Sequence, residues 1–369
     1  MKLENLSKIV SGGTPSTKRK DFWENGNIPW INSGKLNEGY VNEGSKLITQ
    51  KGLEGSSTKL MPPDTVLIAL TGATVGTTAL LNIEACANQS VVGILPSEKH
   101  NSKYLLYYLK SIYNNILNDA NGAAQPGINQ KYVRNILFPN KPLEEQNKIT
   151  EILDKAFEKI DKAIANIERN IENAEELNKS FVNNILTPTK KWLTSNFELL
   201  FKLKSGEALS SKKMNPGSIP VYGGNGITGF HNSSNLSPPQ VIVGRVGANC
   251  GNVRLVEKNI WLTDNAFSVL GELQKFNLNY LTHALNFLNL RSFARQSAQP
   301  VISNSSLKKI NFAFPGDIEE QKLIANKIDC IKSESQKLVS GYQNKLIELK
   351  NLKKSILEKA FKGELTSAA

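Results

Sequence analysis

Pro142-Leu143-Glu144-Glu145-Gln146 opens a long charged segment, and Ile318-Glu319-Glu320-Gln321 opens another one 175 residues later. Each is preceded by a related block, Gln125-Pro126-Gly127-Ile128 before the first and Gln299-Pro300-Val301-Ile302 before the second. A repeat of fixed period decides the architecture of a chain more strongly than any single motif. The sequence therefore predicts two copies of one unit, each a globular segment that ends in a long helix. Such a chain suits a ligand that consists of two separated half-sites.

The two charged segments carry a heptad pattern typical of helices that pack against each other. Counted from Gln146, nine of the twelve a and d positions in residues 143–186 are apolar. Residues 318–363 keep the same register, because 175 is a multiple of seven. Two arrangements are open: each helix lies along its own domain, or the two helices pack together. The second is favoured, because about 44 residues make a helix of roughly 65 Å and a domain of this size spans about 30 Å.

The remaining residues are expected to form globular domains of mixed α/β structure with long loops. The expected strands lie at 65–70, 89–95, 240–244 and 267–270, and the expected helices lie at 102–117, with Ser102 as N-cap, and at 280–293. The sequence thus predicts an α+β protein with two pseudo-symmetric domains, residues 1–142 and 187–317, separated by a coiled coil of residues 143–186 and 318–369. The two helices are expected to be antiparallel, because the chain returns through a whole second domain.

No catalytic motif is complete in this sequence. The glycine-framed stretches 72–76 and 247–251 lack the lysine of a phosphate-binding loop, so each is expected to form a tight turn between strands. Cys86, Cys250 and Cys330 are widely spaced and odd in number, which indicates a reducing compartment and no zinc framework. The three histidines show no metal-ligand spacing. The chain is expected to bind rather than to catalyse, with no cofactor of its own.

The positive charge is concentrated on the globular segments. Residues 1–142 carry 15 lysines and arginines against 10 aspartates and glutamates, and residues 187–317 carry 14 against 6. The helical segments carry 6 against 10 and 10 against 7. This distribution is typical of a polyanion binder, although a generally lysine-rich proteome would also raise the charge. The polar N-terminus and the lack of a long apolar stretch predict a soluble, cytoplasmic protein.

The order and duplication of short motifs resemble the specificity subunits of type I restriction–modification systems over essentially the whole chain. In the first half the resemblance rests on Ile28-Pro29-Trp30-Ile31, Gly72-Ala73-Thr74-Val75-Gly76, Ala87-Asn88-Gln89-Ser90, Gln125-Pro126-Gly127-Ile128-Asn129-Gln130 and Pro142-Leu143-Glu144-Glu145-Gln146. In the second it rests on Ile219-Pro220-Val221-Tyr222-Gly223, Asp264-Asn265-Ala266, Gln299-Pro300 and Ile318-Glu319-Glu320-Gln321. The second half departs where Val221 replaces Trp30, Val301 replaces Gly127, and Asn304-Ser305 replaces Asn129-Gln130.

The resemblance implies a non-catalytic subunit with two target-recognition domains, each of which reads one half of a bipartite site in double-stranded DNA. It also implies that the paired helices set the gap between the half-sites and dock two adenine-N6 methyltransferase subunits. A restriction/translocase subunit would join that core. S-adenosylmethionine, ATP and magnesium would belong to those partners.

Basic residues in turn-rich segments are the candidates for DNA contact, because a loop can approach phosphates or a groove. Arg245 and Arg295 lie beside repeated motifs, and a guanidinium can pair bidentately with guanine, worth about 1–3 kcal/mol of discrimination. Gln125 and Gln299, which match across the repeat, are either further contacts or structural residues. The candidates are Lys18, Arg19, Lys20, Lys35, Lys212, Lys213, Arg245, Arg254, Arg291 and Arg295.

The first helical segment is net acidic, and its outer face carries Glu172, Glu175 and Glu176. Because DNA would repel these carboxylates, the face is expected to dock the methyltransferase subunits. The alternative is a solvated helix face without a partner.

Two other functions are open for the whole chain. One is a stand-alone regulatory or architectural DNA-binding protein without an enzyme partner. The other, a coiled-coil scaffold that binds no nucleic acid, is disfavoured by the charge of the globular segments.

Overall fold

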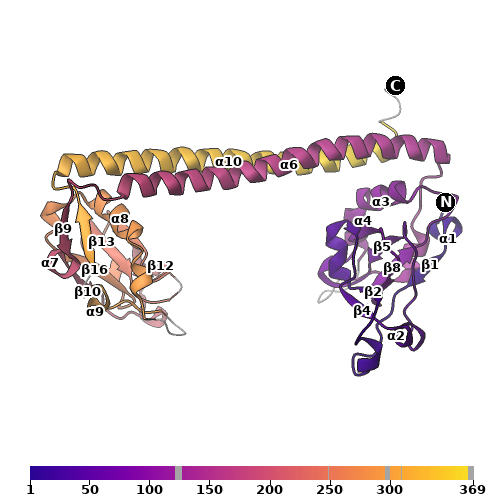
Figure 1. Ribbon diagram of the computed structural model, residues 1–369, viewed down its shortest axis with the longest axis horizontal. Helices are drawn as coiled ribbons and strands as arrows, with labels where there is room; N and C mark the ends of the chain where they lie inside the picture. The colour runs from indigo at the N-terminus through magenta and orange to yellow at the C-terminus, as the bar shows by residue number, and fades with distance from the viewer. Residues whose placement is uncertain (121–126, 248, 296–299, 309, 365–369) are drawn as a thin grey trace. The chain divides into compact units, whose positions relative to one another are not determined.

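The computed structural model describes residues 1–364 except 121–126, 248, 296–299 and 309. The chain divides into two compact units. Unit 1 consists of Met1–Ile167 and Asn344–Ala369, and unit 2 consists of Glu168–Gln343. The two long helices, α6 (Leu143–Leu186) and α10 (Ile318–Lys362), each contribute to both units (Figure 1).

Unit 1 contains two sheets. The larger has the order β1 (Ile9–Ser11), β8 (Val91–Ile94), β5 (Val66–Ala69), β6 (Thr78–Leu81) and β3 (Tyr40–Val41), and only its β3–β6 pairing is parallel. The smaller has the order β4 (Lys46–Ile48), β2 (Ile28–Ile31) and β7 (Cys86–Ala87), with β2 parallel to β7. The helical elements of this globular part are α1 (Leu3–Leu6), η1 (Lys20–Phe22), η2 (Ser33–Glu38), α2 (Gln50–Glu54), η3 (Gly72–Thr74), α3 (Ser102–Ser111), α4 (Tyr113–Asp119) and α5 (Gln130–Asn135).

Unit 2 repeats this plan. Its larger sheet has the order β10 (Phe201–Ser205), β16 (Ala266–Gly271), β13 (Gln240–Gly244) and β14 (Val253–Val256). Its smaller sheet has the order β12 (Gly226–His231), β11 (Ile219–Gly223) and β15 (Trp261–Leu262), with β11 parallel to β15. Its other elements are β9 (Leu193–Asn196), α7 (Phe197–Leu200), η4 (Ser211–Lys213), η5 (Leu273–Lys275), α8 (Leu278–Phe287), η6 (Leu290–Phe293), α9 (Asn304–Leu307) and β17 (Asn311–Phe314). The shared strand order confirms that the sequence repeat is a repeat of structure.

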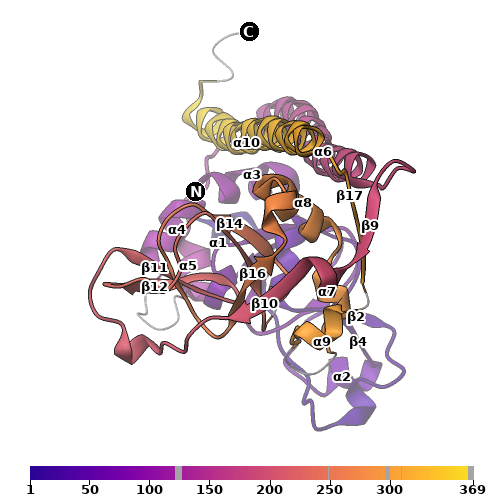
Figure 2. The same ribbon diagram turned by 90° about the vertical axis from the view of Figure 1, so that its left-hand side faces the viewer.

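The strand pair β9–β17 lies where unit 2 joins the two long helices. β9 follows the end of α6, β17 precedes the start of α10, and the two strands pair antiparallel from Asn311 opposite Asn196 to Phe314 opposite Leu193 (Figure 2). The chain that enters the globular part is therefore hydrogen-bonded to the chain that leaves it.

The predicted glycine turns are confirmed. Gly72 and Gly76 frame the turn between β5 and β6 with φ of 74° and 77°, and Gly247 and Gly251 frame the turn between β13 and β14 with φ of 88° and 87°. A side chain is disfavoured at such φ values, so glycine is required by the turn and not by a bound phosphate.

The predicted helix boundaries need correction. The N-cap before α3 is Asn101, whose side chain accepts from the Tyr104 amide, and not Ser102. The segment 102–117 is two helices, α3 and α4, which meet at Ile112. In unit 2, α8 begins two residues earlier than expected and stops before Asn289, whose left-handed backbone (φ 51°) separates it from η6.

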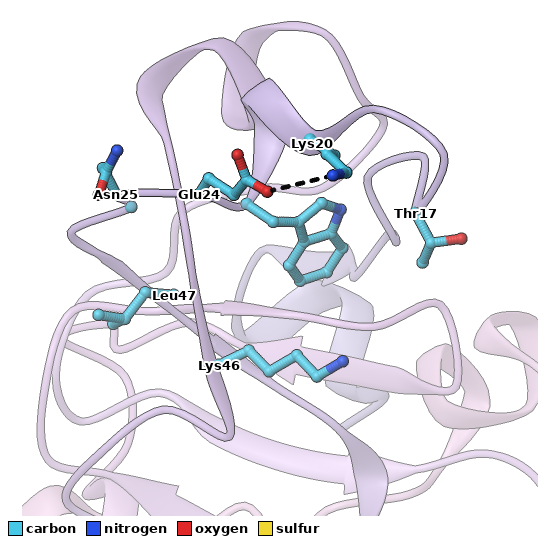
Figure 3. A pocket seen from close by; sticks show the side chains of 8 residues that line it. Thr17, Lys20, Glu24, Asn25, Lys46 and Leu47 are labelled. Atoms are coloured by element: carbon cyan, nitrogen blue, oxygen red, sulfur yellow. Dashed lines mark ion pairs between the residues drawn. The ribbon is translucent and has the colours of Figure 1, made fainter.

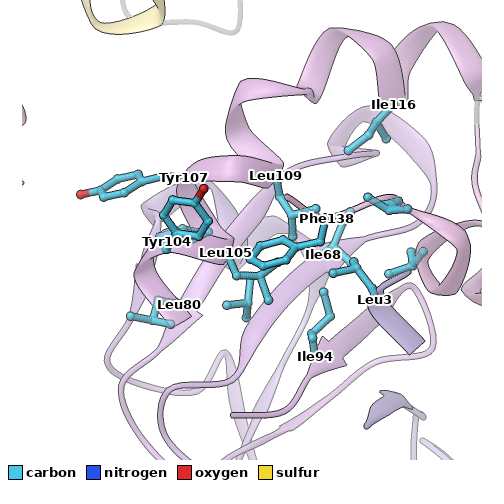
Figure 4. Close-up of a cluster of buried hydrophobic side chains, with 14 of the residues drawn as sticks. Leu3, Ile68, Leu80, Ile94, Tyr104, Leu105, Tyr107, Leu109, Ile116 and Phe138 are labelled. Carbon is cyan, nitrogen blue, oxygen red and sulfur yellow. The ribbon is translucent and has the colours of Figure 1, made fainter. Parts of the chain in front are cut away.

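The core of unit 1 combines the larger sheet, α1, α3 and pieces of both long helices. Figure 4 shows Ile68 and Ile94 from the sheet beneath Tyr104 and Leu105 of α3, with Leu3 at one edge. The same buried cluster takes in Ile149 and Leu153 from the start of α6, together with Leu357 and Ala360 from the end of α10. The start of one long helix therefore packs beside the end of the other, as antiparallel packing requires.

Unit 2 shows the reciprocal arrangement. Its core includes Leu186 at the end of α6 and Ile324, Ala325 and Ile328 near the start of α10. Both arrangements considered for the long helices therefore occur, since each helix contacts its partner and also buries its stripe on a domain. Away from the domain, the stripe is left open: Leu177 is 69% exposed and Leu338 is 49% exposed.

A buried glutamine fastens each long helix to its domain. Gln146 is 1% exposed; its Oε1 accepts from the Asn101 amide at 2.9 Å, and its Nε2 donates to the carbonyls of Lys141 at 2.9 Å and Lys99 at 3.4 Å. One side chain thus joins the helix, the chain before it and the N-cap of α3.

Gln321 makes the same three contacts in unit 2. It is 0% exposed, accepts from the Asn277 amide at 2.8 Å, and donates to Pro315 at 2.8 Å and Lys275 at 3.0 Å. Asn277 is the N-cap of α8, as Asn101 is of α3. The glutamine in each Glu-Glu-Gln motif is therefore a structural fastening.

We expect Gln146→Ala to loosen unit 1 alone, because it leaves one amide and two carbonyls, all partly buried, without their partner, which costs on the order of 3 kcal/mol in total. Hydrogen exchange should accelerate in the α3 amides and stay unchanged in α8. Gln321→Ala should give the mirror result.

The matched control is Gln336→Ala, which removes an exposed glutamine from the same helix, α10. We expect it to change the free energy of unfolding by less than about 0.5 kcal/mol. Equal acceleration in both units after either buried substitution would contradict a local fastening.

Candidate nucleic-acid interface

Five of the ten basic candidates lie on one connection in unit 1 and on the equivalent connection in unit 2. We name the chain between β1 and β2, residues 12–27, loop A, and the chain between β10 and β11, residues 206–218, loop B. Loop A carries Lys18, Arg19 and Lys20, and loop B carries Lys212 and Lys213 within η4; all five residues are exposed. Each loop joins an edge strand of the larger sheet to the middle strand of the smaller one.

Loop A holds its arginine in a fixed orientation. Arg19 donates from Nε and Nη2 to the two carboxylate oxygens of Asp21, at 2.8 Å and 2.7 Å, and its guanidinium lies 4.4 Å from the centre of the Phe22 ring. The hydrogen bonds with Asp21 raise the pKa of Arg19, and they lower the pKa of the Asp21 carboxyl. The pairing leaves the Nη1 edge as the free donor edge of a planar group.

A hollow of about 590 Å³ opens beside loop A (Figure 3). Its lining includes the indole of Trp23, with the Lys46 ammonium 5.6 Å from the ring centre. Lys20 and Glu24 form a long ion pair of 4.0 Å at its edge. The hollow is lined by Thr17, Lys20, Trp23, Glu24, Asn25, Gly26, Lys46 and Leu47. An aromatic face with lysines and a side-chain amide suits the stacking and hydrogen-bonding surface of a nucleic acid.

The start of loop A is anchored by a buried indole. Trp30 on β2 donates from Nε1 to the Gly13 carbonyl at 2.9 Å, and the edge of Trp23 packs on its ring with centres 5.3 Å apart. The Trp23 ring that lines the hollow is therefore held by its packing against Trp30, whose indole is itself hydrogen-bonded to the backbone.

Loop B is anchored at the matching backbone position by a different strand. Trp261 on β15 donates from Nε1 to the Glu207 carbonyl at 3.2 Å. Gly13 and Glu207 each lie two residues past the end of the preceding strand, β1 or β10. Trp30 of β2 is paired with Cys86 of β7, and in the equivalent strand pair Val221 of β11 is paired with Trp261 of β15. The tryptophan thus lies on the first strand of the pair in unit 1 and on the second strand in unit 2. The departure of Val221 from the repeat is therefore compensated by a tryptophan on the neighbouring parallel strand.

The departure at Asn304-Ser305 is compensated in a similar way. Ser303 caps α9 as Asn129 caps α5. Asn304 then hydrogen-bonds the backbone of Leu203 in β10, as Gln130 does the backbone of Ile9 in β1. The equivalent capping residues, Asn129 and Ser303, are 174 residues apart, whereas the equivalent residues of the long helices are 175 apart.

Lys35 does not join loop A. Its ammonium lies 2.8 Å from Glu38 and 2.9 Å from Glu43, its side chain is only 14% exposed, and the hydrogen bonds to these two carboxylates raise its pKa. Its charge is already compensated within unit 1, so it is the weakest of the candidates for DNA contact.

The arginines of unit 2 form a second group. Arg245 follows β13, donates from Nη1 to the Asp264 carbonyl at 3.2 Å and lies 5.3 Å from the Phe267 ring centre, with a buried Nε that has no partner among the described atoms. Arg245 and Arg295 both hydrogen-bond through their backbones to the segment Val301–Ile302. Arg254 is half-buried on β14, and Arg291 is exposed on η6. Gln125 and Gln299 lie outside the described residues.

Sequence reasoning missed Trp23, Asn25 and Lys46. Trp23 directly follows the basic run of loop A, and this aromatic–basic neighbourhood was a usable signal. Lys46 has no such signal, because it reaches the hollow only through the pairing of β4 with β2. Glu172, Glu175 and Glu176 are all exposed on α6, as expected of an outer face.

The described residues hold no group of three or more His, Cys, Asp or Glu that could bind a metal ion. Within the same residues, none of the helices combines the length and apolar character needed to cross a bilayer.

The sequence matches the family described as "Type I restriction modification DNA specificity domain" over residues 1–173 and again over residues 189–349. The chain belongs to this family. The double match coincides with the two halves of the internal repeat. A member of this family specifies the DNA target of a type I restriction–modification complex, and the specificity subunit is not its catalytic subunit.

Relatives support the assignment over most of the chain. The EcoprrI specificity subunit of Escherichia coli is 28% identical over 346 residues, which is 89% of this chain and 86% of the relative. The EcoR124I/EcoR124II specificity subunit of Escherichia coli is 32% identical over 156 residues, 41% of this chain and 39% of the relative.

Solved structures share the fold of this specificity subunit. A chain from a study of complex assembly and conformational transition of the type I R-M system matches with a TM-score of 0.81 at 16% identity, covering 99% of this chain and 97% of that one. The HsdS subunit of Thermoanaerobacter tengcongensis matches with a TM-score of 0.60 at 16% identity, covering 99% and 96%.

We expect Trp30→Phe to free loop A while loop B stays ordered. The substitution keeps an aromatic ring but removes the hydrogen bond to Gly13, a loss of about 1 kcal/mol. Limited proteolysis should cut within residues 12–27 faster than in the wild type. Trp261→Phe should instead sensitise residues 206–218; unchanged cleavage of both loops would show that the indoles are not their anchors.

Proposed function

We propose that each unit of this specificity subunit reads one half of a bipartite site in double-stranded DNA, with loop A and loop B as the reading segments. The single observation that carries the proposal is the equivalence of the two loops. Each loop leaves the edge strand of the larger sheet in its own unit. In each, an indole donates a hydrogen bond to the backbone near the start of the loop, and the loop presents exposed basic residues. Two such segments in one chain suit a ligand with two half-sites.

The two loops differ in ways that favour different half-sites. Loop A combines lysines with the fixed Arg19 guanidinium and the Trp23 hollow. Loop B presents Lys212 and Lys213, with Arg245 and Arg295 elsewhere in unit 2. Lysines mainly contact phosphates and fix the position of the protein, whereas a planar guanidinium can read guanine in the major groove. We therefore assign base reading to the arginines and positioning to the lysines.

We further propose that α6 and α10 dock adenine-N6 methyltransferase subunits, with a restriction/translocase subunit completing the complex. In unit 2 an apolar groove of about 590 Å³ runs between the two helices. Its exposed walls include Leu177, Phe181 and Leu338. Glu172, Glu175 and Glu176 are exposed on the same helix, α6. A partner with an apolar helix stripe fits the groove, and basic residues on the partner would suit the three carboxylates, which makes a solvated face without a partner the weaker interpretation.

The stand-alone regulator is the weaker interpretation of the chain as a whole, because membership of the family places the chain in an enzyme complex. The number of methyltransferase subunits and the role of each helix in holding them are part of the proposal.

Domain exchange tests the independence of the two readers. Residues 1–142 should be replaced by the matching segment of a related specificity subunit, and the chain expressed with its methyltransferase partner. Methylation mapping across the host genome should show one half of the motif changed and the other half unchanged. A motif that changed in both halves, or that proved to be one continuous block, would be incompatible with one reader per unit.

Charge reversal tests the docking surface. The triple variant Glu172→Lys, Glu175→Lys, Glu176→Lys should weaken assembly with the methyltransferase by at least tenfold, while the affinity of the free chain for its DNA site falls by no more than a factor of two, a difference of about 1 kcal/mol or more between the two effects. The matched control reverses the exposed Glu348 and Glu358 on α10. Assembly that survives the triple variant intact would rule out this face.

A further inference from the structure

Unit 1 contains a second basic feature that lies outside loop A. A cavity of about 480 Å³ is lined by residues of α3, α4 and the C-terminal part of α10. Lys110 from the last turn of α3 and Lys350, Lys353 and Lys354 from α10 line it. Among the lining residues that the structure describes, there is no aspartate or glutamate.

The four lysines of the cavity come from helices, and only one of them forms an ion pair with a carboxylate. Lys350, Lys353 and Lys354 follow the spacing that puts side chains on one helix face. The Lys353 ammonium lies 2.7 Å from both carboxylate oxygens of Asp161. Over the residues that the structure describes, Lys110, Lys350 and Lys354 form no ion pair with a carboxylate. The cavity therefore carries an uncompensated positive charge.

The surroundings of Lys110 disfavour its positive charge. Its side chain is half-buried, and burial lowers its pKa; the nearby charge of Lys353 lowers the pKa further. Positive charges held close together in a partly buried site repel one another, and a bound anion would relieve that repulsion.

The neutral groups around the cavity indicate which anion it suits. The lining also includes Asn37, Thr77, Thr78, Ser111 and Asn114. Hydroxyl and amide groups together with lysines are the side chains that contact phosphate oxygens in protein–DNA complexes.

The repeat shows that this cavity belongs to one unit only. The positions on α6 that match Lys350, Lys353 and Lys354 at the 175-residue offset are Glu175, Asn178 and Lys179. The matched positions thus carry three positive charges in unit 1 and no net charge in unit 2. Surfaces that differ in charge at matched positions are suited to different partners.

We propose that the cavity lined by Lys110, Lys350 and Lys354 binds phosphates of the DNA backbone outside the bases that the loops read, and so adds affinity that does not depend on sequence. The inference rests on the proposed function, because it takes DNA as the ligand of the chain. Bound DNA would place phosphate oxygens against the two free ammonium groups of α10 and the end of α3.

Salt dependence provides the test. The variants Lys110→Gln, Lys350→Gln, Lys354→Gln and their combination are assembled as full-length chains with the methyltransferase partner. Dissociation constants are measured over a range of salt concentrations, for a duplex that carries the target and for one that lacks it. Each lost phosphate contact should reduce the slope of log affinity against log salt by about 0.9. Both duplexes should weaken by the same factor, and the methylated motif should stay the same.

The matched control is Lys345→Gln with Lys359→Gln, which removes two exposed charges from the same helix outside the cavity and should leave the slope unchanged. An unchanged slope in the triple cavity variant would overturn the proposal. Weaker assembly with the methyltransferase at an unchanged slope would assign the cavity to a protein partner and also overturn it. The proposed function fails separately, if the wild-type complex does not prefer the target duplex.

Discussion

A single buried amide holds each long helix to its globular part, and the rest of each unit depends on that contact. The Gln146 and Gln321 side chains are themselves buried, and each satisfies one backbone amide and two backbone carbonyls. Their contacts fix the first turn of a long helix against the N-cap of α3 or α8. Because α3 and α8 in turn cover the larger sheet, the amide also sets how that sheet, and the loop that leaves it, is positioned within its unit.

The features that sequence could predict are those that depend on residues close along the chain or on a fixed period. The repeat, the heptads and the glycine turns are of this kind, and the structure contains all three. The errors arose from tertiary packing. Asn101 rather than Ser102 caps α3, because the capping residue is the one whose amide Gln146 holds. No property of residues 101 and 102 alone distinguishes these possibilities.

The candidate site divides in the same way. The exposed basic runs of loops A and B could be found from composition, whereas the hollow around Trp23 requires the pairing of β4 with β2. Val221 and Trp261 illustrate the point most clearly. As a linear comparison, the second half had lost the tryptophan of the first; in the sheet, the indole has moved to the adjacent strand and reaches the same backbone carbonyl position. The hydrogen bond from an indole to this carbonyl is therefore kept in both units, although the tryptophan that donates it is at a different position of the repeat.

The division of the chain also has a topological meaning. Unit 2 is a continuous segment, Glu168–Gln343, whereas unit 1 is built from both ends of the chain. In the language of domain organisation, unit 2 is an insertion, and it enters unit 1 in the middle of one helix and leaves it in the middle of another. Among the described residues, the strands of unit 1 and the Gln146 fastening come from the first piece, and the second piece supplies the end of α10, up to Lys362. A chain with two such units can thus arise when one globular segment and the helix that follows it are duplicated in tandem, because each long helix then contributes to both units.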